Sequence, residues 1–168
     1  MATENKKFNI SELVNEYGCF DLQFRKDTRH KRTGSPTYYR WNTQFIITSS
    51  KDKIDILNKI GNELKCGKIN ISKDQARFSV QKIDDIKEKI IPYFRKNQLS
   101  GKKKNDFNLW QKAVEIIYNN KGKSLINWKR NEFLQLLEIH KSAVKYKEKP
   151  RQSKWIEDAT TLAKTLKI

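Results

Sequence analysis

The sequence predicts an α+β fold, in which helices cover one face of an antiparallel four-stranded sheet. Two pairs of segments alternate apolar and polar residues with the period of two that is typical of half-buried strands, and a helical pattern separates the pairs. Apolar residues then recur with helical spacing through the C-terminal half. The predicted order is helix, strand, strand, helix, strand, strand, helix, followed by further C-terminal helices.

The first helix is predicted over residues 10–17, with Leu13 and Val14 inward, and Gly18 ends it. One strand follows from Cys19 and a second covers residues 38–48. Alternate side chains of a strand lie on opposite faces, so the apolar parity packs on helices and the other parity forms an open, polar and basic face. The inward set is Phe20, Leu22, Phe24, Tyr39, Trp41, Thr43, Phe45 and Ile47; the open set is Asp21, Gln23 and Arg25, or their parity partners, with Arg40, Asn42 and Gln44.

A helix capped by Ser50 is expected to run to about Leu64, and a hairpin follows around a turn near Lys73. Acidic residues at 84–85 suit the start of the next helix, which we expect to end at Pro92. The remaining helices are predicted from about Lys104, around residues 133–144 and from 155 onward. The buried or edge-packed residues expected there are Trp110, Trp128, Trp155 and His140.

The chain has 168 residues, enough for one well-buried domain, which we place at residues 1–148, with a basic hinge and an amphipathic helix at 149–168. No apolar run approaches the roughly 20 residues of a membrane span, so no membrane partner is expected. The N-terminus shows no signal or transit pattern. Cys19 and Cys66 are too few for a disulfide framework, and no Cys/His cluster suggests zinc.

The charge balance indicates a polyanionic partner. Lys and Arg total 36 against 19 acidic residues, a net charge of +17, and each cation set against a phosphate releases condensed counterions. The alternative is a soluble protein with a Lys-heavy surface from an AT-rich genome. That bias explains the excess of Lys over Arg, but not the shortage of acidic residues.

Four segments, in order, resemble the LAGLIDADG homing endonuclease family across residues 8–145. Residues 10–20, ISELVNEYGCF, are similar to the signature helix and its first strand. Residues 45–57 are similar to the second strand and following helix, Cys66-Gly67-Lys68-Ile69 to the start of the third strand, and residues 91–107 to the segment that ends the core. The resemblance implies an αββαββα core, a homodimer of single-motif chains with the signature helices at its centre, and DNA cleavage. It also implies Mg²⁺ held by the last acidic residue of each motif.

The motif departs from the family pattern at the residues that carry its chemistry. Tyr17 occupies the metal-binding acidic position, Asn15 replaces another Asp, and Ser49 replaces the Gln that positions water. A phenol with a pKa of about 10 is neutral at pH 7 and a poor Mg²⁺ ligand. Glu12 replaces a small residue of the helix–helix seam, so we expect a weakened seam. The alternative is that the helix begins later and Glu12 faces solvent; in either case the standard homodimer is no longer expected.

We therefore expect no metal, no cofactor and no cleavage, but retained nucleic-acid binding. The preferred hypothesis, motivated by Tyr17, Glu12 and the charge of +17, is a mitochondrial RNA-binding component of a ribonucleoprotein, either a ribosomal subunit or an intron maturase. Tyr38, Tyr39 and Trp41 could stack on unpaired bases, although one parity of them must pack against helices. One alternative is an active, Mg²⁺-dependent, homodimeric DNA endonuclease that uses Glu16 and Lys102; another is a DNA-binding repressor. The predicted nucleic-acid contacts are Arg25, Lys26, Arg29, Lys31, Arg32, Arg40, Asn42, Gln44, Lys102, Lys103 and Lys104.

Overall fold

The computed structural model describes residues 9–27, 38–145 and 156–166. Four strands form one antiparallel sheet in the order β1-β2-β4-β3, which confirms the predicted fold class. The elements are α1 (Ile10–Tyr17), β1 (Gly18–Asp27), β2 (Tyr38–Ser50), α2 (Ile54–Leu64), β3 (Lys68–Ser72), β4 (Gln75–Val80), α3 (Ile83–Asp85), α4 (Ile91–Lys96), α5 (Gly101–Asn119), α6 (Arg130–Lys145) and α7 (Ile156–Ala163). Short 3₁₀ turns cover Lys51–Lys53 and Leu125–Asn127, and a π-helical turn covers Ile86–Ile90.

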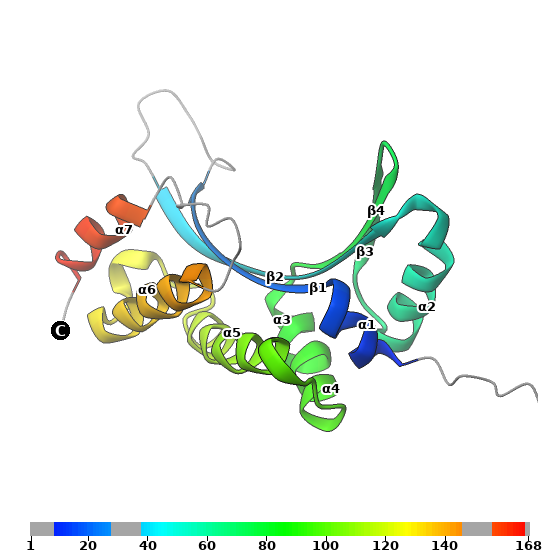
Figure 1. The fold of residues 1–168 in the computed structure, drawn as a ribbon. Helices are drawn as coiled ribbons and strands as arrows, with labels where there is room; N and C mark the ends of the chain where they lie inside the picture. Colours follow the sequence, from blue (N-terminus) through cyan, green and yellow to red (C-terminus); the bar gives the residue numbers. More distant parts are fainter. Residues whose placement is uncertain (1–8, 28–37, 146–155, 167–168) are drawn as a thin grey trace, which may run out of the picture.

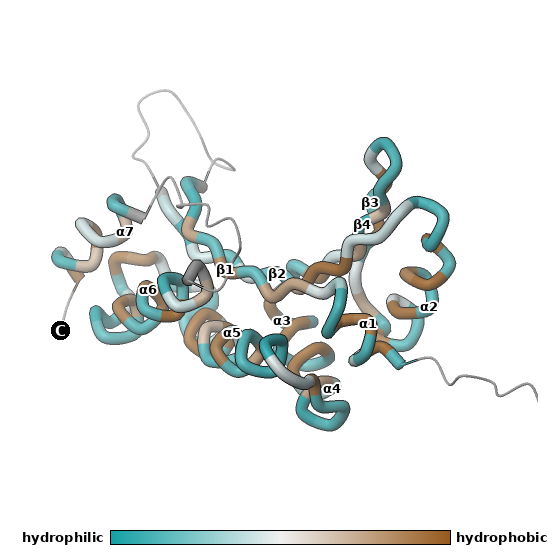
Figure 2. Tube along the Cα trace, viewed as in Figure 1, coloured by the Kyte–Doolittle hydropathy of each residue, from teal (hydrophilic) through white to brown (hydrophobic). Residues whose placement is uncertain are grey.

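The sheet is curved, and Figure 1 shows its concave side facing up, with α1, α3, α4, α5 and α6 below it. The long strands β1 and β2 form the floor, while the β3–β4 hairpin rises at one end with α2 on its outer side. Brown apolar positions on the helices gather mainly toward the sheet in Figure 2. This arrangement leaves the concave face free of the described helices.

Two aromatic-rich clusters fill the space between the sheet and the helices. The first surrounds Phe20, Phe45 and Phe94, whose rings lie 5.4–5.9 Å apart. The second surrounds Phe24 and Phe133 and includes residues of α7. Each fully buried aromatic or large aliphatic side chain contributes roughly 1.5–3 kcal/mol to folding, so these clusters hold the helices against the convex face.

Gly18 fixes how α1 meets β1. Its backbone N–H donates to the Val14 carbonyl, and a Cβ at this position would lie 2.5 Å from Val14 Cγ1 and 2.8 Å from Val14 O. Only a residue without a side chain allows so close an approach. The helix therefore ends at Tyr17 and the strand begins at once, as the sequence predicts.

Ser50 is the N-cap of the 3₁₀ turn that leads into α2, as predicted, but its side chain makes no capping bond. The boundary predicted at Pro92 is wrong. Pro92 does not end a helix; it lies in the first turn of α4, directly after the π-helical turn at Ile86–Ile90. In the described parts of the chain, no helix is both long and apolar enough to cross a membrane.

Candidate nucleic-acid interface

The open face of the sheet follows from the strand register. Asp21 pairs with Gln44, Gln23 with Asn42, and Arg25 with Arg40, so these six side chains share the side opposite Phe20 and Phe24. Pairing of β4 with β2 and β3 extends the same face across the hairpin. The face carries Cys19, Asp21, Gln23, Arg25, Arg40, Asn42, Gln44, Ile46, Thr48, Lys68, Asn70, Ser72, Gln75, Arg77 and Ser79.

A hollow of about 520 Å³ lies over this face of the sheet. Its lining contains two guanidinium groups and seven neutral polar side chains, and no carboxylate. These residues are Arg25, Gln44, Thr48, Asn70, Ser72, Gln75, Arg77, Ser79 and Gln81. Such a surface attracts anions and offers hydrogen-bond donors and acceptors, which is the chemistry of a groove-reading interface.

Gln44 organises the centre of this hollow. Its side chain is only 6% exposed, and its Oε1 accepts hydrogen bonds from Arg77 Nη2 at 3.5 Å and from Gln81 Nε2 at 3.4 Å. Arg77 is exposed, and its neighbours across the sheet are Thr48 and Asn70, both short and uncharged. The guanidinium therefore keeps most of its five donors for a ligand.

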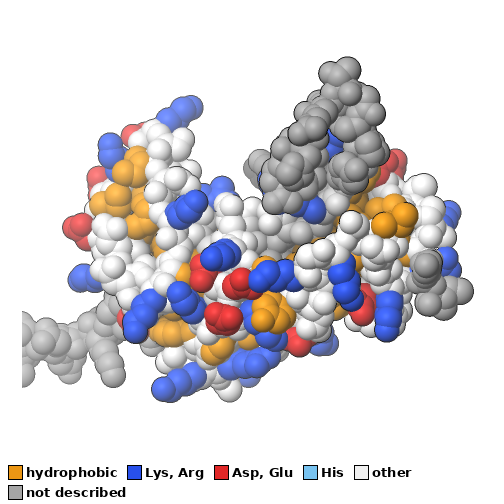
Figure 3. All heavy atoms as spheres, turned by 180° about the vertical axis from the view of Figure 1, so that it is seen from behind, with side chains coloured by type: hydrophobic (Ala, Val, Ile, Leu, Met, Phe, Trp, Pro, Cys, Tyr) orange, Lys and Arg blue, Asp and Glu red, His pale blue; other side chains and the backbone are white. Residues whose placement is uncertain are grey.

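The helical side has a different charge pattern. Figure 3 shows Lys and Arg interspersed with Asp and Glu over this side of the molecule. Lys121 is 2.6 Å from Asp84, and Lys87 is paired with Glu115. Neighbouring acids offset these two cations, whereas the lining of the hollow over the sheet contains no carboxylate.

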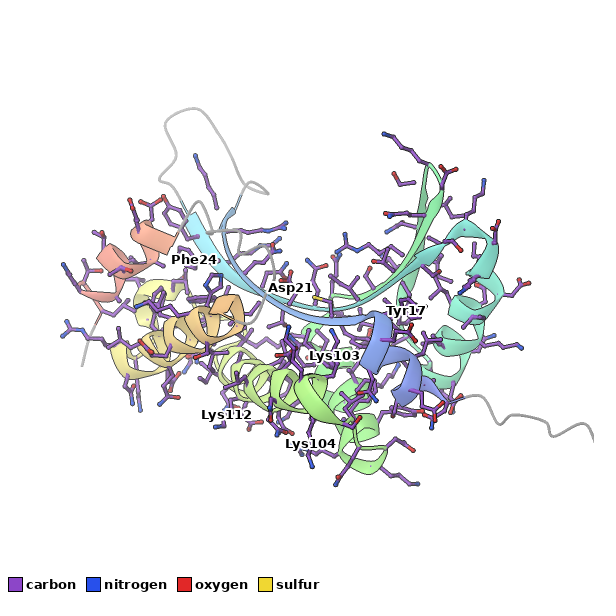
Figure 4. The ribbon with its side chains drawn as sticks, viewed as in Figure 1. Tyr17, Asp21, Phe24, Lys103, Lys104 and Lys112 are labelled. Carbon is purple, nitrogen blue, oxygen red and sulfur yellow. The ribbon has the colours of Figure 1, made fainter. Side chains whose placement is uncertain are left out.

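At the end of α1, Lys103 is the cation that reaches the junction with β1. Its Nζ donates to the Gly18 carbonyl, and Figure 4 shows it between α5 and the start of β1. Nearby, Trp110 Nε1 donates to the Asp21 carbonyl at 3.0 Å. A depression of about 440 Å³ beside these residues is also lined by Lys102 and Asp106.

Tyr17 stands at the end of the motif helix, where the resemblance implies a divalent ion. Its side chain is 45% exposed, and Lys53 Nζ lies 5.8 Å from the centre of its ring. The hydrogen bond to Glu16, with the negative charge of that carboxylate, raises the pKa of the phenol above its ordinary value of 10.0. The hydroxyl is thus neutral at pH 7, and the adjacent carboxylate is already engaged with it. This donor set does not fit a divalent cation.

The predicted contacts are distributed over both faces. Arg25, Arg40, Asn42 and Gln44 share the open face, whereas Lys26 pairs with Tyr39 on the helix-facing parity. Lys102 and Lys103 lie near the α1–β1 junction, but Lys104 projects from α5 away from the sheet, as does Lys112 (Figure 4). Arg29, Lys31 and Arg32 lie outside the described residues.

Two of the three aromatic side chains considered for base stacking, Tyr39 and Trp41, instead lie beneath the sheet; the side chain of Tyr38 is outside the described part of the structure. Trp41 is 5% exposed and packs against Phe24, Phe133 and His140, with ring centres 5.0–6.4 Å apart. Tyr39 stacks on Phe24 at 5.3 Å. His140 and Trp110 are core residues, as predicted.

Sequence reasoning missed Lys68, Asn70, Arg77 and Gln81. The alternation of β4 could have located Arg77, because Ala76, Phe78 and Val80 alternate with polar residues and are the buried side chains of the strand. Assigning that parity would have placed Arg77 on the open face.

Comparison with known proteins agrees with this geometry. A family model described as LAGLIDADG endonuclease matches residues 14–114. A probable intron-encoded DNA endonuclease 1 from Mycosarcoma maydis is 26% identical over 94 residues, which are 55% of this chain and 31% of that protein. The chain thus aligns with about a third of that relative's length.

Solved structures show the same fold. The homing endonuclease I-TnaI matches with a TM-score of 0.70 at 19% identity, covering 92% of this chain and 95% of its own. I-SmaMI bound to uncleaved DNA matches at 0.72 with 18% identity, and the LAGLIDADG meganuclease I-AabMI at 0.69 with 21%. These matches cover 90% and 94% of this chain but 47% and 49% of theirs. The chain belongs to the LAGLIDADG endonuclease family.

Proposed function

We propose that this chain binds duplex DNA across the open face of its sheet and does not cleave it at the end of α1. One observation carries the proposal: the described helices lie on the convex side, and the concave side offers a hollow lined by cationic and neutral polar groups. The DNA-bound relatives I-SmaMI and I-AabMI, which share the fold, support DNA as the ligand.

The shape and chemistry of the open face suit a B-form duplex. The major groove of B-DNA is about 12 Å wide and admits a two-stranded β-ribbon. The β3–β4 hairpin presents Asn70, Gln75 and Arg77 on its inner side, and such side chains bond to base edges. Arg25 and Arg40 lie opposite one another on β1 and β2, where two like charges are stabilised by a shared anion.

RNA is less well matched to the same surface. Recognition of unpaired bases relies on exposed aromatic rings, but Trp41 is buried and Tyr39 packs on Phe24. The major groove of an A-form helix is also too narrow for a hairpin to enter. The ribosomal or maturase role stays a prediction that these contacts do not favour, and the mitochondrial location stays a prediction.

The absence of cleavage is proposed from Tyr17. In place of a carboxylate, the end of α1 carries a neutral phenol that donates to Glu16. The alternative, an endonuclease that uses Glu16, requires that carboxylate to leave Tyr17 and bind the ion. A nicking assay on the duplex that binds most tightly, with Mg²⁺ and then Mn²⁺, separates the two. The proposal expects intact DNA, whereas metal-dependent cutting that Glu16→Gln abolishes would overturn it.

Binding is tested with paired charge reversals on the two sides of the molecule. Arg25→Glu with Arg77→Glu removes the guanidinium groups of the hollow, and Lys104→Glu with Lys112→Glu makes the same charge change on the far side of α5. Fluorescence anisotropy with a DNA duplex, an RNA duplex and a hairpin RNA is the readout. We expect a large loss of DNA affinity for the first pair only. Equal losses for both pairs, or tighter binding to either RNA, would contradict the proposal.

A further inference from the structure

We propose that Arg77, held by Gln44, reads a guanine in the major groove and so sets the base preference of this chain at one position. This inference rests on the proposed duplex-DNA function and goes beyond it, because it assigns one base to one side chain. The guanidinium fork matches guanine O6 and N7, the most common specific contact of arginine with DNA.

The first step is the position of Arg77 in the sheet. It lies in the middle of β4, between Thr48 of β2 and Asn70 of β3. Both neighbours are too short to cover a guanidinium and carry no charge to hold it. The hollow beside it is lined without a carboxylate, so no lining residue competes with a ligand for the arginine by forming an ion pair.

The second step is the orientation of the guanidinium. Gln44 is only 6% exposed, and its Oε1 accepts hydrogen bonds from both Arg77 Nη2 and Gln81 Nε2. Arg77, which only donates, fixes the direction of the Gln44 amide, because the amide oxygen rather than the NH₂ group must face it. Gln81 Nε2 then donates to the same oxygen. One edge of the arginine is thereby tethered to the floor of the hollow, and the rest of the fork is available above it.

The third step separates base reading from phosphate binding. A phosphate contact needs only positive charge, which lysine also supplies, whereas a bidentate base contact needs the planar fork of arginine. Ordering a long side chain before binding lowers the entropic loss of forming that contact. A buried amide spent on holding an arginine is therefore expected for base reading and is unnecessary for phosphate attraction.

The experiment compares base preferences of wild type, Arg77→Lys, Gln44→Ala and Lys112→Gln by selection from a randomised duplex library. Wild type should select guanine at one position. Arg77→Lys should lose about tenfold or more of the preference at that position and keep the preferences elsewhere. Gln44→Ala should weaken the same preference, while Lys112→Gln, on the outer side of α5, should leave it unchanged.

A chemical substitution in the DNA completes the test. Replacing the selected guanine by 7-deazaguanine removes the N7 acceptor, so wild type should lose affinity and Arg77→Lys should be indifferent. Arg77→Lys with the base preference of wild type would overturn the inference while leaving the proposed function intact. Failure of the wild type to bind any duplex would overturn both.

Discussion

Replacing Gly18 by alanine tests the junction that places Tyr17 at the end of α1. The backbone at Gly18 has φ −79°, which alanine adopts freely, so the effect comes from space alone. The added Cβ would lie 2.5 Å from Val14 Cγ1, 2.8 Å from Val14 O and 3.0 Å from Val14 Cα. Two of these three atoms are backbone, so a rotamer change of Val14 does not relieve the overlap.

Overpacking of this kind costs about 1–3 kcal/mol, and a urea m-value of roughly 1–3 kcal/mol/M converts that loss into a midpoint lowered by the order of 1 M. The matched control is Gly61→Ala in α2, whose Cβ would lie 3.3 Å from the edge of the Phe78 ring and 3.8 Å from Cys66 O. Alanine is favoured over glycine in a helix by about 1 kcal/mol, which offsets the tight contact with Phe78, so the midpoint of the control should change little. Urea unfolding followed by tryptophan fluorescence measures both variants. A Gly18→Ala midpoint equal to that of wild type would refute the account of the junction.

Three further predictions concern the edge strand, the phenol and the open face. Trp110→Phe should destabilise the fold by about 1–3 kcal/mol in thermal or urea unfolding, because the Asp21 carbonyl of edge strand β1 loses its 3.0 Å bond; an unchanged midpoint would contradict this. The raised pKa of Tyr17 means that the stability from its bond to Glu16 is present below pH 10 and is lost as pH rises through the raised value. An ultraviolet titration of tyrosine ionisation assigns to Tyr17 the step that Tyr17→Phe lacks. In Glu16→Gln this step should move to lower pH, and a step that stays in place would exclude Glu16 as the cause of the raised pKa. Arg25→Gln should reduce the slope of log affinity for DNA against log salt by about 0.9, while Lys112→Gln leaves the slope unchanged; equal slopes for all three proteins would exclude a phosphate contact.

The strand periodicity was sufficient to predict the sheet and half of the open face. In β1 and β2 every second residue is apolar, so the parity facing the helices is unambiguous, and Arg25, Arg40, Asn42 and Gln44 follow from it. The same argument excludes Tyr39 and Trp41 from the open face, since they share the parity of Phe45. Of the three rings considered for stacking, Tyr39 and Trp41 thus belong to the parity that packs against the helices.

Other features depend on helix phase, which composition does not determine. The long helix was expected from about Lys104, but it begins at Gly101. Neighbouring residues of a helix point about 100° apart. For this reason Lys103 reaches Gly18 while the next residue, Lys104, projects outward. The hydrogen bond from Arg77 to Gln44 joins residues 33 positions apart in the sequence, and a local sequence pattern does not predict such a contact.

Site-directed photo-crosslinking tests the central claim most directly. A photoreactive amino acid is placed at Asn42, on the open face of β2, or at Lys112, on the outer side of α5, and each protein is irradiated with a labelled DNA duplex. The account predicts a DNA adduct from position 42 and none from position 112. An adduct from position 112 with none from position 42 would show that DNA lies against the helices, and would contradict the account.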